Sequence, residues 1–209
     1  MSFYKDTVYP LLVERFGNPP PIQALRREIV PLARGTVLEL GAGSGANFPF
    51  YDASRVNRLY ALEPNPGMRR RAEGNQRGTG LDVQFLSLPG ERIPLEDASV
   101  DTVVSTFTPC TITAVQEAMR GVARVLKPGG ALLFLENSAA ADVRVRRWQR
   151  WWEPFHRRVF AGLVLTRDIP LLIAGAGLRP QRVEHVYLSR FPKSWSHCCY
   201  GLAIKPEPT

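Results

Sequence analysis

Short apolar runs and amphipathic stretches alternate along the chain. The apolar runs predict strands near residues 36–40, 58–62, 82–86, 101–106, 131–136, 181–188 and 197–204. Helical patterns fall near residues 4–16, 20–31, 46–50, 66–76, 113–126, 143–160 and 167–176. Strands that alternate with helices predict an α/β fold with a parallel sheet. Ligands of such sheets bind at the carboxyl ends of the strands, so the residues at those ends are the first candidates for function.

The segment after the first predicted strand carries the strongest local signal. Three glycines follow Leu40 at alternate positions: Gly41, Gly43 and Gly45. Glycine permits a positive φ and lets the backbone approach a bound nucleoside closely. Glu63 ends the next strand about twenty residues later, where a carboxylate can accept both hydroxyls of a ribose. This unit therefore predicts a nucleoside-binding site.

Four segments resemble the motifs of the class I S-adenosylmethionine-dependent methyltransferases. They are Val37–Gly45, Leu62–Pro64, Ser99–Val104 and Arg124–Gly130. The last segment ends in Leu-Lys-Pro-Gly-Gly, a turn that does not belong to nicotinamide-binding folds. The resemblance implies S-adenosyl-L-methionine as the cofactor and S-adenosyl-L-homocysteine as its product. It also implies a Rossmann-like, doubly wound, seven-stranded sheet, mostly parallel with the last strand antiparallel, and helices on both faces.

The resemblance and the strand-end rule together select the residues expected to bind the cofactor. They are Glu39, Gly41, Ala42, Gly43, Asn47, Glu63, Pro64, Gly90, Glu91 and Thr106. The family usually has Asp or Asn after the third strand, whereas this chain has Pro89, which offers neither an N–H nor a side-chain acceptor. The adenine contact is therefore assigned to the Gly90 backbone and to Glu91. Thr106 is assigned to the cofactor's amino group, and a surface role stays open for Glu91.

The chain of 209 residues suffices for one methyltransferase domain. Its expected parts are an N-terminal helical cap (1–33), a cofactor-binding core (34–137) and an acceptor-side helical segment (143–177). The third part is similar to the thiol S-methyltransferases and their bacterial relatives in Trp148–Phe155 and Gly162–Asp168. Those relatives often carry cysteine where this chain has Leu163.

Large apolar side chains recur at helical spacing in the acceptor-side segment. They are Trp148, Trp151, Trp152, Phe155 and Val159. Pro154 is expected to kink or restart the helix. We interpret residues 143–168 as a mobile cover, partly packed as core, over a mostly apolar acceptor pocket.

His156 lies beside these tryptophans and is the candidate catalytic residue. A basic group beside a thiol favours the reactive thiolate. The alternative for His156, as for His185 and His197, is an ordinary structural role.

The chain is basic, with a net charge of +8 and a pI near 9.9. Because no nucleic-acid-binding module accompanies the scattered arginines, solvated helix faces explain the charge better than nucleic acid does. Peripheral membrane contact through the basic aromatic helix stays open. The three cysteines lack metal-ligand spacing, so we expect no bound metal. The sequence shows no signal pattern and no apolar stretch of bilayer length, which predicts a cytoplasmic protein. A monomer is favoured.

The resemblance to the class I methyltransferases implies an enzyme that moves a methyl group to a small-molecule acceptor, with a thiol as one candidate. A sulfonium methyl is already activated, so in-line displacement mainly needs alignment and exclusion of water. One alternative is a lipid-amine or quinone-ring methyltransferase, which shares the core motifs. Another is a non-enzymatic nucleoside-binding protein. A nicotinamide oxidoreductase ranks last, because only one nucleotide-binding half is evident.

Overall fold

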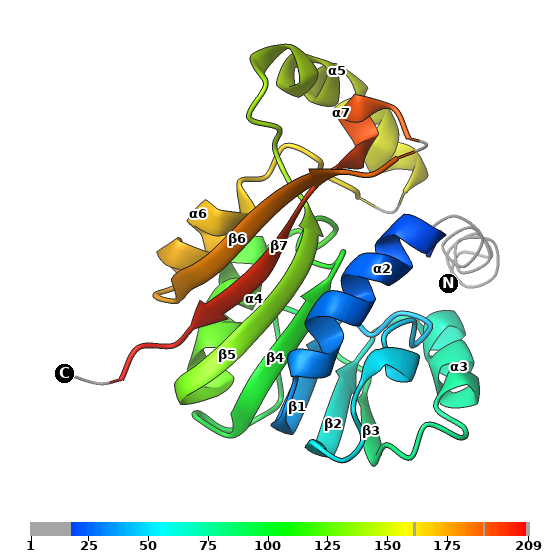
Figure 1. Cartoon of the computed structure of the whole chain (residues 1–209), viewed down its shortest axis with the longest axis vertical. Coiled ribbons are helices and arrows are strands. Elements are labelled where there is room, and N and C mark those ends of the chain that lie inside the picture. The colour runs from blue at the N-terminus through cyan, green and yellow to red at the C-terminus, as the bar shows by residue number, and fades with distance from the viewer. Residues whose placement is uncertain (1–17, 161, 190, 208–209) are drawn as a thin grey trace.

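The computed structural model describes residues 18–207 except 161 and 190, so the helix expected at 4–16 lies outside the described residues. Within them, one sheet has the strand order β3-β2-β1-β4-β5-β7-β6 (Figure 1). Its strands are β1 (Gly35–Leu40), β2 (Val56–Leu62), β3 (Val83–Leu86), β4 (Val100–Thr106), β5 (Leu126–Asn137), β6 (Arg179–Tyr187) and β7 (His197–Ile204). Strands β1 to β5 pair in parallel, whereas β7 lies antiparallel between β5 and β6. The expected fold is confirmed.

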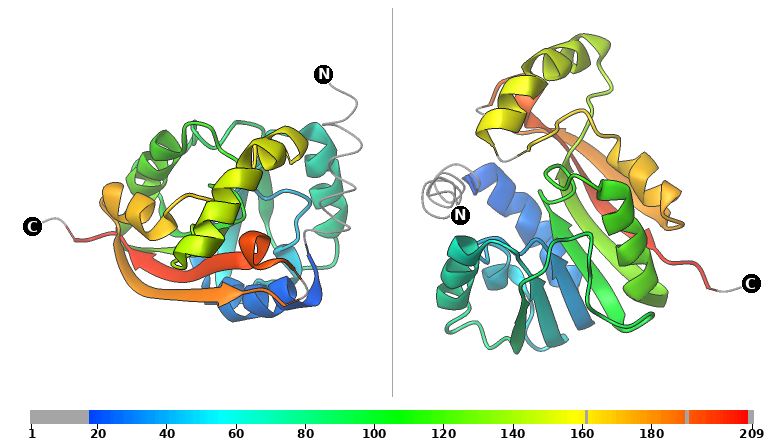
Figure 2. Two further views of the ribbon diagram at one scale, coloured as in Figure 1. Left: turned by 90° about the horizontal axis from the view of Figure 1, so that it is seen from above. Right: turned by 180° about the vertical axis from the view of Figure 1, so that it is seen from behind.

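Helices cover both faces of the sheet (Figure 2). They are α2 (Pro20–Ile29), α3 (Pro66–Asn75), α4 (Val115–Val125), α5 (Val143–Val159), α6 (Ile169–Gly175) and α7 (Lys193–Ser196), with 3₁₀ turns η2 (Val30–Leu32) and η3 (Phe48–Phe50). One buried cluster joins α2, η3 and α3 to the sheet, and a second joins α4 and α6 to its other face. Helix α5 instead lies with α7 beyond the carboxyl ends of the parallel strands β1, β4 and β5 (Figure 1).

Three local features differ from the sequence-based expectations. The helix expected at 46–50 is only the short turn η3, and α7 was not expected. Helix α5 continues through Pro154, so of the two expected outcomes, a kink or a restart, the restart does not occur. None of the helices in the described residues is long and apolar enough to cross a bilayer.

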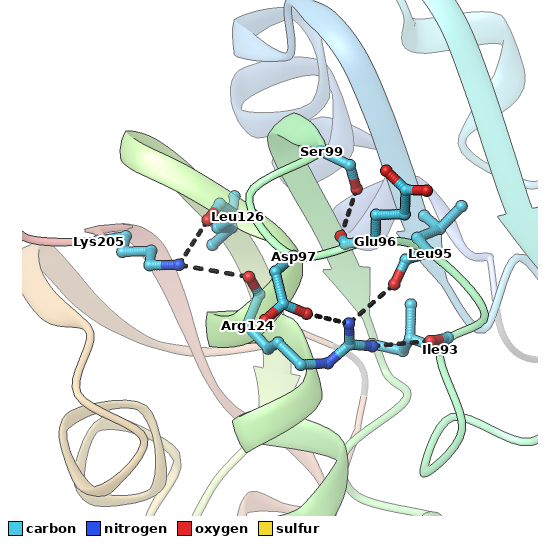
Figure 3. A network of polar contacts seen from close by, with 8 residues as sticks. All are labelled: Ile93, Leu95, Glu96, Asp97, Ser99, Arg124, Leu126 and Lys205. Carbon is cyan, nitrogen blue, oxygen red and sulfur yellow. Dashed lines mark hydrogen bonds and ion pairs between the residues drawn. The ribbon is translucent and has the colours of Figure 1, made fainter.

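Polar contacts fix the amino ends of β4 and β5, opposite the glycine turn (Figure 3). The Arg124 guanidinium at the end of α4 donates to the carbonyl oxygens of Ile93 and Leu95, each at 2.8 Å. The Lys205 ammonium donates to the carbonyl oxygen of Leu126 at 2.7 Å. Cations at the C-terminus of a helix are also stabilising, because that end of the helix dipole carries partial negative charge. Side-chain contacts therefore close this end of the sheet. Ligands of such sheets bind at the opposite end, where the strands have their carboxyl ends.

Candidate active site

A cleft of about 1310 Å³ opens at the carboxyl ends of the central strands. The glycine turn and Glu63 line one side, and His156 of α5 and Trp195 of α7 line the other. Sites for a single small ligand usually measure about 300–1,000 Å³. The cleft therefore has room for a cofactor together with a second small molecule.

The glycine turn presents its backbone to this cleft. Gly41 has a φ of +68°, and a Cβ there would meet the Thr108 side chain at 2.4 Å. Gly43 has a φ of +57°, and a Cβ there would have nothing within 4 Å. Both positions favour glycine because of the left-handed backbone. At Gly43 the open space lies where a nucleoside ligand would pass.

Glu63 is 8% exposed and is held by the backbone. Its Oε2 accepts a hydrogen bond from the Gly43 N–H at 2.9 Å, and its Oε1 accepts one from the Asn65 N–H at 2.8 Å. Burial raises the pKa of Glu63, and these two donors oppose the rise. A carboxylate has about four acceptor positions, so each oxygen can accept another hydrogen bond. The carboxylate fits a ribose with two hydroxyls.

A buried polar network lies behind the turn. The Glu39 carboxylate accepts from Asn47 Nδ2 and from the Tyr51 hydroxyl, each at 2.9 Å. Burial raises the pKa of Glu39 to about 7. Asn47 Nδ2 also donates to Thr106 Oγ1 at 3.0 Å. Glu39 and Asn47 thus support the turn and the end of β4 from behind rather than from the cleft surface.

Arg26 of α2 completes this network and was missed by the sequence analysis. It is 5% exposed, donates from Nη1 to Thr106 Oγ1 at 2.9 Å, and donates to Asn47 Oδ1. Within the described residues it forms no ion pair, and its Nε is buried without a hydrogen-bond partner. Burial lowers the pKa of Arg26.

The Glu39 and Glu136 carboxylates act on Arg26 through space and oppose the fall in its pKa. A buried guanidinium without an ion pair at contact distance is nevertheless costly, and Arg26 lines the cleft. An anionic group of a ligand would satisfy it. The sequence did hold a signal, because Ile22, Arg26 and Ile29 share the buried face of α2. An arginine on the apolar face of a helix is unusual enough to suggest a partner.

Most of the expected cofactor-binding residues line the cleft. They are Gly41, Ala42, Gly43, Glu63, Pro64, Gly90 and Thr106. Glu91 is not among the cleft-lining residues, and its Oε1 accepts from the Ala114 N–H at 3.4 Å. An adenine contact of Glu91 therefore stays a prediction without support from its position.

His156 projects from α5 toward the cleft and is 1% exposed. In the described part of the chain neither ring nitrogen has a hydrogen-bond partner. The Trp195 ring meets it edge-on at a centroid distance of 4.6 Å, and the Trp152 ring stacks at 6.4 Å. Burial lowers the pKa of His156, which favours the neutral imidazole.

The other two histidines have structural surroundings. His197 Nδ1 lies 2.9 Å from the carbonyl oxygen of Ser138, and His185 stacks on the His197 ring at 5.3 Å. Neither of them lines the cleft. Among the three histidines, His156 is thus the one that lines the cleft.

The aromatic stripe of α5 faces inward only in part, which fits the expectation of a segment partly packed as core. Trp151 is 65% exposed and Trp148 is 57% exposed, whereas Trp152 is half-buried. The buried side of the helix carries Gln149 and, about two turns further along, His156. Gln149 accepts from the Ala140 N–H at 2.9 Å and donates to the carbonyl oxygen of Ser138 at 3.2 Å. A polar anchor therefore holds α5 alongside the aromatic contacts of Trp152 with His156 and Trp195.

Residues 38–134 match the model of a methyltransferase domain family. Human thiol S-methyltransferase TMT1A is 31% identical over 84% of this chain and 72% of its own length. The quinone C-methyltransferase UbiE of Rubrivivax gelatinosus is 34% identical over 79% of this chain and 60% of its own length. The chain spans about half of human thiol S-methyltransferase TMT1B, covering 55% of it at 35% identity.

Solved structures show the same fold. A methyltransferase from Aquifex aeolicus superposes with a TM-score of 0.63 at 20% identity, over 94% of this chain and 98% of its own. The chain is a class I S-adenosylmethionine-dependent methyltransferase. Within that class, it belongs to the family that includes thiol S-methyltransferase TMT1A.

Proposed function

We propose that this methyltransferase transfers the methyl group of S-adenosylmethionine to an apolar small molecule, with a thiol sulfur as the favoured acceptor atom. The observation that carries the proposal is the single cleft that joins the glycine turn to the aromatic wall around His156. Its size leaves room for an acceptor beside the cofactor. The likeness to a thiol S-methyltransferase supports the choice of acceptor.

The cofactor would lie along the glycine turn with its ribose on Glu63. Arg26 would bind the carboxylate of the cofactor's methionine part, because in the described residues this buried guanidinium has no ion pair and its Nε has no hydrogen-bond partner. Thr106 Oγ1 already accepts from Arg26 and Asn47, so the hydroxyl retains a proton to donate. A donor suits the carboxylate better than the amino group to which the sequence assigned Thr106.

The Arg26 assignment has a test that needs no turnover. Arg26→Met keeps the length and the apolar stem but removes the charge. Wild-type protein should bind S-adenosylhomocysteine more tightly than 5′-methylthioadenosine, which lacks the amino-acid part. The variant should lose most of that preference in calorimetry, whereas Arg120→Met, on the exposed side of α4, should keep it. Equal weakening of both ligands would show a merely structural role.

On the acceptor side, His156 would take the proton of the bound thiol. Its neutral imidazole has a free acceptor nitrogen, and its aromatic surroundings exclude water. The thiolate sulfur forms a bond to the methyl carbon as the carbon–sulfur bond of the sulfonium breaks. The electron pair of that bond stays on the departing sulfur, which gives S-adenosylhomocysteine. S-adenosylmethionine supplies the activated methyl group.

An acceptor screen with radiolabelled S-adenosylmethionine tests the reaction. We expect label in alkyl or aryl thiols and little in short-chain quinols or phospholipid amines. Labelled quinol without labelled thiol would favour the second candidate, a quinone-ring methyltransferase, which the likeness to UbiE supports. Absence of transfer to every class, with intact cofactor binding, would contradict both.

Residues 143–168 would act as a cover that closes over the acceptor. The helix is anchored near its start by Gln149, while His156, Val159 and Phe160 line the cleft. Hydrogen exchange should show α5 less protected than β4 without ligands, and more protected with cofactor and acceptor together. Equal protection of α5 and β4 in the empty protein would make α5 a fixed wall.

A further inference from the structure

The outer face of α5 carries a strip of exposed aromatic rings. Trp151 is 65% exposed, Trp148 57% and Phe155 47%, and Val143 at the start of the helix is 74% exposed. The rings of Trp148 and Trp151 pack edge-to-face at 5.6 Å. Figure 1 shows this helix at the end of the molecule, beyond the sheet. Exposed apolar groups gathered in this way mark a binding surface rather than chance exposure.

Arginines flank the aromatic strip. Those on α5 are Arg144, Arg146, Arg147, Arg150, Arg157 and Arg158. Successive residues of a helix are about 100° apart around its axis. Viewed down that axis, Arg147 and Arg158 therefore lie next to Trp151 on the outer face, on the side away from Trp148. Glu153 is the one carboxylate of α5; its side chain is 20% exposed and accepts from the Thr166 hydroxyl. The face is thus aromatic and cationic, with almost no exposed negative charge.

We propose that α5 docks the protein on an anionic phospholipid bilayer. Trp148, Trp151 and Phe155 would enter the boundary between headgroups and acyl chains, where aromatic rings are favoured. The flanking arginines would contact lipid phosphates. A basic helix with aromatic residues on one side is the pattern of an interfacial helix. Duplex nucleic acid would satisfy the arginines but would leave the aromatic strip in water, and single-stranded RNA, whose bases stack on aromatic rings, is the competitor that the test below includes.

Docking in this way would bring the bilayer to within one helix diameter, roughly 10–12 Å, of the cleft wall around His156. His156 lies on the inner side of the same helix that carries Trp148 and Trp151 on its outer side. An apolar acceptor dissolved in the bilayer would then have a short path to the aromatic wall. This consequence rests on the proposed function, whereas docking itself does not.

Vesicle co-sedimentation of the full chain tests the docking. The neutral probe is a vesicle of phosphatidylcholine alone. The anionic probe is a vesicle of phosphatidylcholine with about 30% phosphatidylglycerol, which gives the bilayer a negative surface potential. We expect binding to the anionic vesicles that weakens with salt. Trp148→Ser/Trp151→Ser and Arg147→Glu/Arg150→Glu should each lower the affinity at least about tenfold. Brominated lipid should quench the tryptophan fluorescence of the wild type.

Matched control variants separate the site from general hydrophobicity and charge. Leu32→Ser/Leu171→Ser removes exposed apolar groups elsewhere, and Arg77→Glu/Arg120→Glu makes the same change in net charge away from α5. Both should bind anionic vesicles within about twofold of the wild type. Cofactor affinity and thermal melting check that every variant is folded, independently of any acceptor.

Three results would overturn the proposal. The first is unchanged vesicle binding in the two α5 variants. The second is equal binding to neutral and anionic vesicles. The third is tight binding to RNA, or self-association through the tryptophans, in place of vesicle binding.

Discussion

The two walls of the cleft differ in chemistry and in their origin along the chain. The cofactor wall comes from the ends of β1, β2 and β4, and its buried polar groups bond one another, as Glu63 does with the Gly43 backbone. The acceptor wall comes from α5 and α7, where rings surround His156, an imidazole without a polar partner in the described residues. The first wall is organised for one defined ligand. The second offers mainly apolar contact and no fixed set of polar partners in the described residues.

The sharpest test of this difference is Gly43→Val. The left-handed φ of +57° strains a β-branched residue, and its side chain would project into the open space of the cleft. We expect cofactor affinity to fall by at least about 100-fold in calorimetry, roughly the effect of 3 kcal/mol. Gly78→Val is the matched control, because Gly78 has a φ of +79° and open surroundings outside the cleft.

The control should lose stability but keep its cofactor affinity. Wild-type affinity in a folded Gly43→Val protein would show that the turn does not touch the ligand. It would also remove the basis for treating the first wall as organised around a cofactor.

A second large effect should appear in stability against pH. Glu136 at the end of β5 is fully buried, accepts from Ser105 Oγ at 2.9 Å, and has an Oε2 without a partner in the described residues. Burial raises its pKa to about 8. The folded protein therefore holds a proton that the unfolded chain releases near pH 4.5. The contribution of protonated Glu136 to the stability of the fold is therefore complete below about pH 4.5, and it is lost as the pH rises toward the folded-state pKa of about 8.

Between pH 5 and pH 8 the wild type should lose about 3 kcal/mol more of its free energy of unfolding than Glu136→Gln does. Urea unfolding at both pH values measures the difference. Glu39, which has two side-chain donors and a pKa of about 7, should give a smaller difference in the same experiment as Glu39→Gln. Parallel pH profiles of wild type and Glu136→Gln would mean that the carboxylate is ionised when folded.

Glu63→Ala should act on the cofactor wall alone. Loss of the carboxylate should weaken cofactor binding by about 1.5–3 kcal/mol, the scale of charge-assisted hydrogen bonds, with the acceptor KM unchanged. Glu91→Ala, outside the cleft, should bind the cofactor normally. Reversed results for these two variants would move the nucleoside toward the β3–β4 connection, as the sequence-based assignment of Glu91 implied.

What the sequence could predict follows the same division between the walls. The glycine turn and Glu63 were recognisable because their spacing is local and each glycine has a backbone reason. Arg26 escaped notice because its partner Thr106 lies 80 positions away, and only folding brings them together. Helical periodicity grouped the tryptophans of α5 without telling which of them face the core, and the structure leaves Trp151 exposed and Trp152 half-buried. Gln149, a polar residue, provides the anchor.

The smallest expected effect is that of His156→Phe, and it decides whether the acceptor wall does chemistry or only packs. Phenylalanine keeps an aromatic ring against Trp195 but removes the nitrogen that would take the thiol proton. At pH 7 we expect kcat/KM for a thiol to fall about tenfold, the low end of general-base effects when the nucleophile is acidic. Near the ordinary thiol pKa of about 8.5 the acceptor ionises by itself, so the ratio of wild type to variant should shrink toward one as pH rises. His185→Phe, which changes an imidazole outside the cleft, should leave the rate unchanged at both pH values. A deficit that stays constant with pH, or that comes with weaker cofactor binding, would assign His156 to packing and make both walls passive supports for a reaction driven by alignment alone.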